Sequence, residues 1–456
     1  MQDRTAILEK IRKNLFHGPL TYTKNQPDLF MPHKFQIVGP RQGGELLRKA
    51  KENLRQEELL VYVHVPFCFS ECIFCNSFPH KVDAKIQQDY LRDLLQEIEI
   101  FSRSGIFEGK KAKALYFGGG TPTSFASADL RTIIEAIRSH VDFSEKCSIT
   151  TEAHPLTLAN EKRVAELAAI GITRISIGCQ TFDPGVLELC NRTNTEPQIA
   201  RIVRSVQAAG LAINMDMMTG LPGQTLEGVR NDLRILEKLR PDAVEYIRHE
   251  IVNPLAVELY KDRPDLMLTD DELFEMVLVT QEWMGANGYE QNGRFSDCRQ
   301  WEYRYHWLHE MPIIAFGLRA RSYTGSLWYD NHQDLPTYSL MIHKGAPPAA
   351  RSLTLTTREQ MYRTLFLSLQ LRSGLDVRKF QERFHENPLV LFGSLLAKLQ
   401  EYGCIEQDAQ SVRLTQYGAW FVEDVCDYIT DVALREESND LVRSPHSTGT
   451  QLPTIS

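Results

Sequence analysis

The sequence predicts an α/β protein built on a parallel sheet that is closed, or partly closed, into a barrel. Six apolar runs with strand character recur along the chain, and stretches with apolar residues at helical spacing lie between them. Alternating units of this kind form parallel sheets. At 456 residues the chain is also too long for one ordinary core, so the barrel should be one of about three units.

The elements of the barrel follow in order along the chain. The expected strands are Leu59–Pro66, Lys113–Gly120, Cys147–His154, Arg174–Gln180, Ala212–Gly220 and Ala243–Glu250. Helical spacing is found in Gln87–Arg103, Ala128–His140, Asn160–Ala169 and Thr225–Leu239. Residues 58–325 are therefore assigned to the barrel and its C-terminal extension.

Three further segments flank the barrel. Residues 1–57 form an N-terminal extension, with a short helix at Arg4–Leu15 and a charged helix at Gly44–Glu57, expected to pack on the barrel. Residues 326–433 change to helices around a short turn-and-strand piece, Cys404–Thr415, which predicts a small helical, winged-helix-like C-terminal domain. Residues 434–456 are polar, with little to bury, and predict a disordered tail.

Composition narrows the function classes. The chain is 43% hydrophobic and 24% charged, has a net charge of -8, and contains no apolar run that could cross a bilayer. The chain has no basic block interleaved with aromatic residues, which argues against nucleic-acid binding. Without a secretory signal, the expected location is the cytoplasm, and the nine cysteines, an odd number, are expected to be reduced thiols.

Three cysteines stand together directly after the first expected strand. Cys68, Cys72 and Cys75 have C-x-x-x-C-x-x-C spacing. Loops after barrel strands form the active face, so a metal group held here would face substrate. Three thiolates suit an iron–sulfur cluster with one open position, whereas a structural zinc site normally has four protein ligands. Spacing alone leaves open zinc, with His64 or His80 as fourth ligand, and three unrelated buried cysteines.

Other polar or glycine-rich positions end the following strands. Gly119, Gly120 and Thr121 belong to a Phe-Gly-Gly-Gly-Thr-Pro turn, where glycine lets backbone amides approach a ligand closely. Glu152 ends the third strand, and Gln180 and Arg192 follow the fourth. Each has an ordinary reading as a turn, a solvated loop residue or a surface arginine. Asp216 differs, because a carboxylate inside an apolar strand is costly without a partner.

Together with Tyr62-Val63-His64-Val65-Pro66-Phe67-Cys68, these motifs resemble the radical S-adenosylmethionine (SAM) superfamily, specifically its HemN-like branch. The resemblance runs from about residue 59 to 433 and implies a partial (β/α)6 TIM-like barrel with a [4Fe–4S] cluster on the three cysteines. It also implies two SAM molecules. Tyr62, Gly119 and Glu152 match residues around the first, and the second is matched by Phe74, Gly120, Thr121, Gln180, Arg192 and Asp216.

The implied chemistry is reductive cleavage of SAM to a 5′-deoxyadenosyl radical, with electrons from a flavodoxin or ferredoxin and a small-molecule substrate. The branch includes a coproporphyrinogen III dehydrogenase, heme chaperones, and methylases or cyclopropanases. The full second-SAM set favours class C methyl or methylene transfer to an sp2 carbon. Oxidative decarboxylation of coproporphyrinogen is the main alternative, and a heme chaperone is the second.

Departures from the coproporphyrinogen enzyme support that preference. Asn76-Ser77 replaces a stretch in which that enzyme has a further cysteine, and the sixth strand ends in Arg248-His249-Glu250. An aromatic and basic stretch lies downstream, including Tyr303 and Arg321. Candidate substrate residues are Arg248, His249, Glu250, Arg294, Tyr305 and Arg319. Neither the substrate nor the oligomeric state follows from the sequence.

Overall fold

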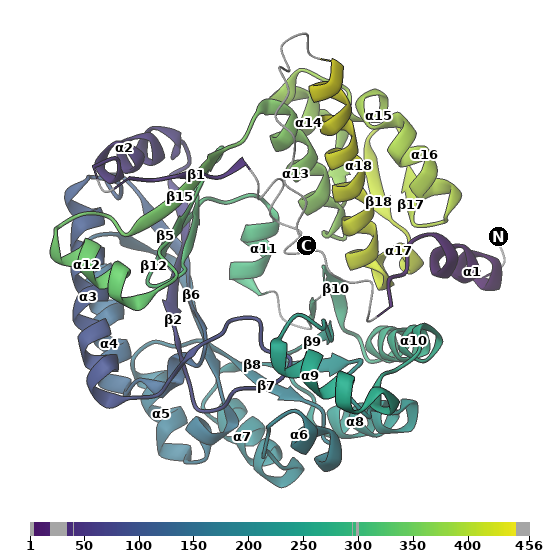
Figure 1. The fold of residues 1–456 in the computed structure, drawn as a ribbon, viewed down its shortest axis with the longest axis horizontal. Coiled ribbons are helices and arrows are strands. Elements are labelled where there is room, and N and C mark those ends of the chain that lie inside the picture. Colours follow the sequence, from purple (N-terminus) through teal and green to yellow (C-terminus); the bar gives the residue numbers. More distant parts are fainter. Residues whose placement is uncertain (1–3, 19–33, 40, 294, 298–300, 444–456) are drawn as a thin grey trace.

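The computed structural model describes residues 4–18, 34–39, 41–293, 295–297 and 301–443. Its centre is a row of six adjacent parallel strands, which confirms the predicted α/β barrel (Figure 1). These strands are β2 (Glu58–Val65), β5 (Lys111–Gly119), β6 (Asp142–Ala153), β7 (Arg174–Gln180), β8 (Ala212–Thr219) and β9 (Ala243–Arg248).

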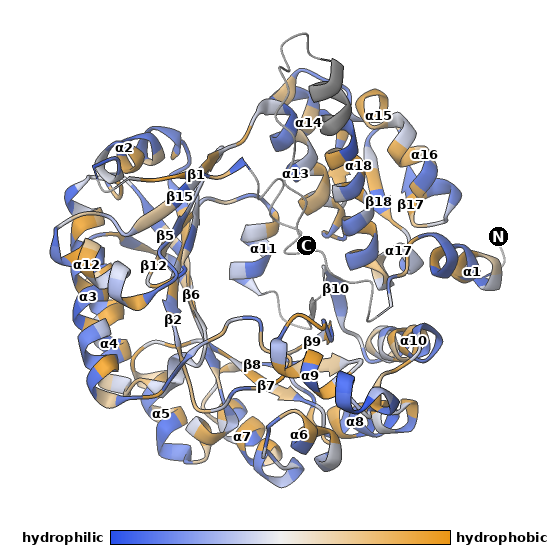
Figure 2. Ribbon diagram, viewed as in Figure 1, coloured by the Kyte–Doolittle hydropathy of each residue, from blue (hydrophilic) through white to orange (hydrophobic). Residues whose placement is uncertain are grey.

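Helices between the strands cover the outer face of this sheet (Figure 1). They are α3 (Ala84–Arg103), α4 (Ser127–Arg138), α5 (Glu161–Ala169), α6 (Pro184–Leu189), α7 (Glu196–Ala208) and α8 (Leu226–Leu239). Each turns an apolar stripe to the sheet, as Leu94 and Ile98 do in α3, and exposes polar residues outward (Figure 2). N-cap side chains fix the starts of several helices: Asp83 accepts hydrogen bonds from the amides of Lys85 and Ile86.

Additional strands extend the sheet beyond both ends of the parallel row. On one side come β12 (Ile313–Phe316), parallel to β2, and then the antiparallel strands β13 (Arg321–Tyr323), β14 (Leu327–Asn331), β15 (Ala349–Thr354) and β1 (Gln36–Ile37). On the other side β11 (Phe295–Asp297) and β10 (Glu290–Asn292) follow β9. The domain boundary predicted between residues 325 and 326 falls inside the β13–β14 hairpin and so divides one sheet.

The remaining helices of this part are α2 (Gly43–Asn53), α9 (Pro254–Asp262), α10 (Asp270–Ala286), α11 (Glu302–Leu308) and α12 (Leu335–His343). Helix α11 lies within the ring formed by the sheet rather than outside it (Figure 1). Trp301, the residue before α11, and Tyr303 in its first turn pack against Tyr116 of β5, with ring centroids 6.0 and 4.9 Å from the Tyr116 ring. Helix α11 is thus a plug in the barrel lumen.

A helical domain lies on the open side of the barrel (Figure 1). It contains α13 (Thr357–Leu369), α14 (Val377–Phe384), α15 (Pro388–Leu391), α16 (Gly393–Glu401), α17 (Gln416–Trp420) and α18 (Val422–Arg443), with a three-stranded sheet of β16 (Leu375–Asp376), β18 (Ser411–Leu414) and β17 (Ile405–Gln407). Helix α18 continues through residues 434–443, where the composition predicts disorder, because Glu436 accepts hydrogen bonds from Tyr362 and Arg358 of α13. Residues 444–456 lie outside the described residues.

The N-terminal extension divides between the two parts. Helix α2 packs on the barrel core through Leu46, Leu47 and Ala50, as expected. Helix α1 (Arg4–Asn14) instead buries its apolar stripe in the core of the C-terminal domain, where Ile7 lies against Gly403. The same cluster includes Phe274, Val277 and Leu278 of α10, so α1 joins that helix to the C-terminal domain. No helix in the described part of the chain is long and apolar enough to span a membrane.

Candidate active site

The cysteine loop starts at the carboxyl end of β2 and lies over the neighbouring strand ends. Cys68 ends the short strand β3 (Phe67–Cys68), which pairs with β4 (His80–Lys81). The Thr121 amide donates to the Phe67 carbonyl over 2.7 Å, and this bond ties the loop to the glycine turn after β5. From the other side Asn253 donates its side-chain amide to the Cys75 carbonyl over 2.8 Å. The loop is therefore held at both ends.

All three thiols lie in or beside this loop. Cys68 Sγ lies 3.1 Å from the Thr121 hydroxyl, and Cys72 Sγ accepts from the Arg192 guanidinium at 3.8 Å. Burial raises the pKa of Cys75, and the charges of Cys72 and Cys68 raise it further. A bound metal cluster would reverse this preference by holding the sulfurs as thiolates.

Zinc is the less suitable occupant. No three His, Cys, Asp or Glu side chains within the described residues converge as ligands of a single metal ion. His64, one proposed fourth ligand, hydrogen-bonds Tyr62 Oη over 3.1 Å, and burial lowers its pKa to about 4. His80, the other, is exposed on β4. Neither histidine is therefore shown as a fourth ligand beside the three thiols.

The glycine turn places backbone close to the cysteine loop. Gly119 has φ of 114°, in the left-handed region, and a Cβ there would lie 2.6 Å from the His64 ring. At Gly120 a Cβ would lie 2.6 Å from the Phe67 carbonyl oxygen. Only glycine lets the turn after β5 pass so close to His64 and to the start of the cysteine loop. The space they border is where the resemblance predicts SAM.

Partly buried carboxylates line the lumen below this turn. Glu152 accepts from Tyr116 Oη over 2.7 Å and from the Gly119 amide over 3.0 Å, and burial raises its pKa to about 7. Asp216 accepts from Ser176 and Asn214, and its pKa is raised mainly by burial and then by the charges of Glu245 and Glu152. Glu245 of β9 was not singled out from the sequence, although it gives the same signal as Asp216, a carboxylate inside an apolar strand.

The residues predicted to surround a second SAM also come together. Arg192 donates to the Gly178 carbonyl and reaches Cys72, so it joins β7 to the cysteine loop. Gln180 has φ of 71°, and its buried Oε1 has no hydrogen-bond partner among the described residues. Phe74 packs with Met218 and other apolar residues near the end of β8. Arg192, Gln180 and Phe74 thus lie near the carboxyl ends of β7 and β8.

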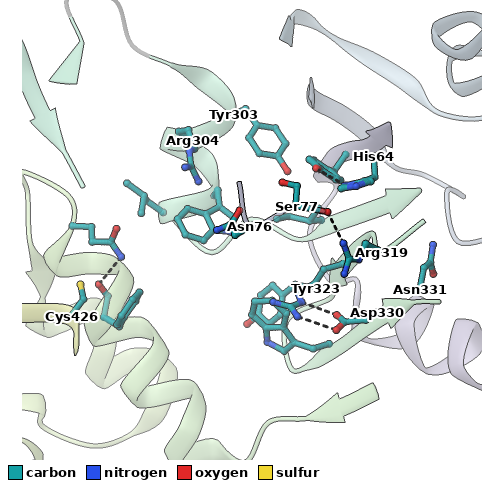
Figure 3. Close-up of a pocket in the computed structure, with 18 of the residues that line it drawn as sticks. His64, Asn76, Ser77, Tyr303, Arg304, Arg319, Tyr323, Asp330, Asn331 and Cys426 are labelled. Atoms are coloured by element: carbon teal, nitrogen blue, oxygen red, sulfur yellow. Dashed lines mark hydrogen bonds and ion pairs between the residues drawn. The ribbon is translucent and has the colours of Figure 1, made fainter. Parts of the chain in front are cut away.

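A pocket of about 530 Å³ opens beside the cysteine loop (Figure 3). Asn76 and Ser77 of the loop border it together with His64 of β2. Arg319 enters it from the turn after β12 and donates to the Ser77 carbonyl over 2.5 Å. The two positions where the sequence departs from the coproporphyrinogen enzyme therefore face this pocket.

The structure separates the predicted substrate residues. Glu250 and Arg319 line the pocket. Arg248 forms ion pairs with Glu423 and Asp424 of α18 instead, and Tyr305 packs with the core of the C-terminal domain. His249 is only 1% exposed, and burial lowers its pKa to about 4. The chain leaves β9 after Arg248, so the strand does not fix the directions of His249 and Glu250. Arg294 lies outside the described residues.

An arginine group on the antiparallel strands forms the far wall of the pocket. Asp330 of β14 accepts from Arg321 Nε over 2.7 Å and from Arg351 Nη2 over 2.7 Å. Arg304 of α11 faces the same space (Figure 3). Arg304, Asp330 and Arg351 carried no sequence signal, because hairpin pairing and the lumen position of α11 bring them together. Arginines exceed the carboxylates within this wall, so it suits an anionic group.

Comparisons with known proteins agree with this site. Residues 62–236 match the family model of the radical SAM superfamily, and residues 355–421 match that of the HemN C-terminal domain. The heme chaperone HemW of Bacillus subtilis is 29% identical over 366 residues, covering 78% of this chain and 95% of the relative. The oxygen-independent coproporphyrinogen III oxidase of Escherichia coli K12 is 24% identical over 443 residues, covering 90% and 96%.

Two further comparisons concern a third relative and a solved fold. The anaerobilin synthase of Escherichia coli O157:H7 is 25% identical over 380 residues, covering 82% of this chain and 84% of the relative. The crystal structure of the Escherichia coli coproporphyrinogen III oxidase superposes with a TM-score of 0.78 at 22% identity, covering 91% of this chain and 99% of that one. The fold is therefore that of the solved enzyme.

The chain belongs to the radical SAM superfamily, and its cofactors are a [4Fe–4S] cluster and SAM. Within that superfamily it is a member of the HemN-like branch. The methyl transfer favoured from the sequence finds no support in these relatives, whose names include a heme chaperone and an oxidase but no methylase. The decarboxylation alternative is the better supported of the two.

Proposed function

We propose that this protein is a radical SAM enzyme that acts on the carboxylate side chains of a tetrapyrrole, by oxygen-independent oxidative decarboxylation of a coproporphyrinogen. The observation that carries the proposal is the 530 Å³ pocket between the cysteine loop and the arginine wall. Its volume is in the usual range for small-molecule sites. Relatives named for coproporphyrinogen and for heme support a tetrapyrrole as the substrate class.

The two walls of the pocket suit the two parts of such a substrate. Propionate carboxylates require guanidinium groups, which Arg319, Arg321 and Arg351 supply. A flat macrocycle requires aromatic surface, and Tyr303, Trp307, Trp328 and Phe366 border the same space. The arrangement brings a bound carboxylate side chain near the cysteine loop, where the reaction starts.

When bound, the cluster and SAM would supply a 5′-deoxyadenosyl radical that takes a hydrogen atom from the substrate side chain; the side chain would then lose CO2 and pass one electron to an acceptor, leaving a vinyl group. The chain's own residues position and protect that step. Gly119 and Gly120 give backbone access, while Glu152 offers a carboxylate to SAM. The plug α11 and the C-terminal domain cover the open side of the barrel, which limits the access of water to the lumen in this proposal. A flavodoxin or ferredoxin is the proposed electron donor.

The test is anaerobic turnover of the cluster-loaded protein with SAM, coproporphyrinogen III and a reductant. Conversion of propionate to vinyl groups with matching 5′-deoxyadenosine is the expected result, and the Cys72→Ala variant is the control without a complete cluster. Cleavage of SAM without vinyl product would contradict decarboxylation. Tight heme binding without SAM cleavage would instead favour the chaperone.

Methyl or methylene transfer is a second candidate, because a specific observation favours it. The resemblance implies a second SAM, and Asn76 and Ser77, where the sequence departs from the coproporphyrinogen enzyme, border the pocket. A methylase would release S-adenosylhomocysteine as well as 5′-deoxyadenosine. The same assay with mass detection of both nucleosides therefore distinguishes the two reactions.

A further inference from the structure

A third carboxylate completes the acidic lining of the lumen. Glu245 on β9 pairs in register with Asp216 on β8. In-register residues of parallel neighbours point to the same face of a sheet. On the other side, Glu152 of β6 pairs in register with Ser176 of β7, whose hydroxyl donates to Asp216 over 3.1 Å. Glu152, Asp216 and Glu245, here called the carboxylate trio, thus cross four adjacent strands.

The trio is electrostatically coupled, with Glu245 buried and Glu152 and Asp216 partly buried. Glu245 is 7% exposed, and its charge raises the pKa of both Asp216 and Glu152. Arg304 of α11 lies 3.9 Å from Glu245 and lowers the pKa of Glu152. Other titratable or charged groups around the lumen come from β2, β5, β7 and α11: Tyr62, Tyr116, Arg174 and Tyr303. Three close carboxylates retain a proton at neutral pH unless more positive charge arrives.

Independent polar atoms indicate which charge that is. Gln180 Oε1 and Asn214 Oδ1 are both buried, and neither accepts a hydrogen bond from any residue that the structure describes. Gln180 is 8% exposed and Asn214 is fully buried. Asn214 lies beside Asp216 on β8, and Gln180 lies over Gly178, the in-register partner of Asp216. The lumen therefore presents acceptors that lack a donor, which suits a ligand with an ammonium group and hydroxyls.

We propose that Glu245 is a third carboxylate of the SAM-binding region, where the residues matched to the first SAM (Glu152) and to the second (Asp216) meet, and that binding of SAM there expels a proton from the trio to solvent. SAM carries a sulfonium, an ammonium and one carboxylate, so it brings net positive charge to these side chains. No bond other than that to the released proton is broken. The inference rests on the proposed radical SAM function and concerns how the protein binds its cofactor.

The experiment is anaerobic titration calorimetry of SAM into the cluster-loaded, oxidised protein, which binds SAM without cleaving it. Two buffers of different ionisation enthalpy, at a pH near the Glu152 pKa of about 7, give the protons released on binding. The wild type should release protons, whereas Glu245→Gln should release fewer and bind about tenfold more weakly, as expected for loss of one charged hydrogen bond. Glu245→Asp keeps the charge and should restore proton release.

A matched control is Glu97→Gln. Glu97 is a fully buried carboxyl whose pKa burial raises to about 7, and it accepts hydrogen bonds from Tyr338 and Asn331 rather than facing the trio. Its substitution should leave proton release on SAM binding unchanged. Equal release by the wild type and Glu245→Gln would overturn the inference while leaving radical chemistry intact. A wild type that binds no SAM would overturn the proposed function itself.

Discussion

The role of Arg248 can be tested by removing its charge. Although its place in the sixth strand predicts substrate contact, its guanidinium donates to Glu423 over 2.9 Å and to Asp424 over 3.0 Å. Asp424 is 1% exposed, and burial raises its pKa while Arg248 opposes that rise. The ion pair therefore joins β9 of the barrel to α18 of the C-terminal domain.

Arg248→Met should destabilise the protein by about 3–5 kcal/mol, because breaking a buried pair leaves the partner charge without compensation. Pairing this change with Asp424→Asn should restore part of the loss by removing that charge. Arg372→Met is the matched control. Arg372 contacts Glu290 over 2.8 Å, also between the C-terminal domain and the barrel sheet, but its side chain is 72% exposed, so its loss should cost less than about 1 kcal/mol.

The assay is urea unfolding of all four proteins, followed by far-ultraviolet circular dichroism, with SAM binding measured in parallel. The expected result is a large fall in the unfolding midpoint for Arg248→Met alone and unchanged SAM affinity at a temperature where it is folded. A fall no larger than that of Arg372→Met would refute the reasoning. So would weaker substrate binding at unchanged stability, which is the outcome that substrate contact requires.

Three further outcomes follow from single side chains. The pKa of Glu97 is raised to about 7, so the free energy of unfolding should fall by about 3 kcal/mol as pH rises from about 4.5 to 7 and the folded protein loses this proton. Glu97→Gln should flatten the pH dependence of the melting temperature over this window, and an unchanged slope would contradict that assignment. Gly120→Ala should prevent cluster loading, measured by visible absorbance, because its Cβ would meet the Phe67 carbonyl at 2.6 Å; normal loading would show that the loop can shift. Arg319→Met should raise the KM for a carboxylated substrate and leave SAM affinity intact; an unchanged KM would remove Arg319 from the substrate wall.

Local pattern was sufficient for the barrel because each of its elements is written in a short stretch of sequence. Strand β7 has the predicted bounds, Arg174–Gln180, and α8 begins one residue after the predicted start at Thr225. Period-two and helical spacing record which face of each element is buried, and a parallel row buries both faces of its strands. The cysteine spacing likewise lies within one loop.

Long-range pairing was invisible to the same reasoning. The arginine wall forms because β13, β14 and β15 continue the barrel sheet as antiparallel strands, with Arg321 and Arg351 meeting at Asp330. The sequence around an arginine in a short strand does not show which carboxylate it will pair with. Helix α1 illustrates the same limit, since an amphipathic stripe shows that a helix packs but does not show against which surface.

The sequence by itself determined the class of chemistry, because the three cysteines and each later motif are short stretches of neighbouring residues that can be read without knowing the fold. Only the tertiary structure decided which side chains border the pocket and which hold the domains together. At and just after the end of the sixth strand it assigned Arg248 to an ion pair and Glu250 to the pocket, and it brought the unremarked Glu245 beside Asp216. The physical reason is that burial, register and charge partners depend on neighbours distant in the chain.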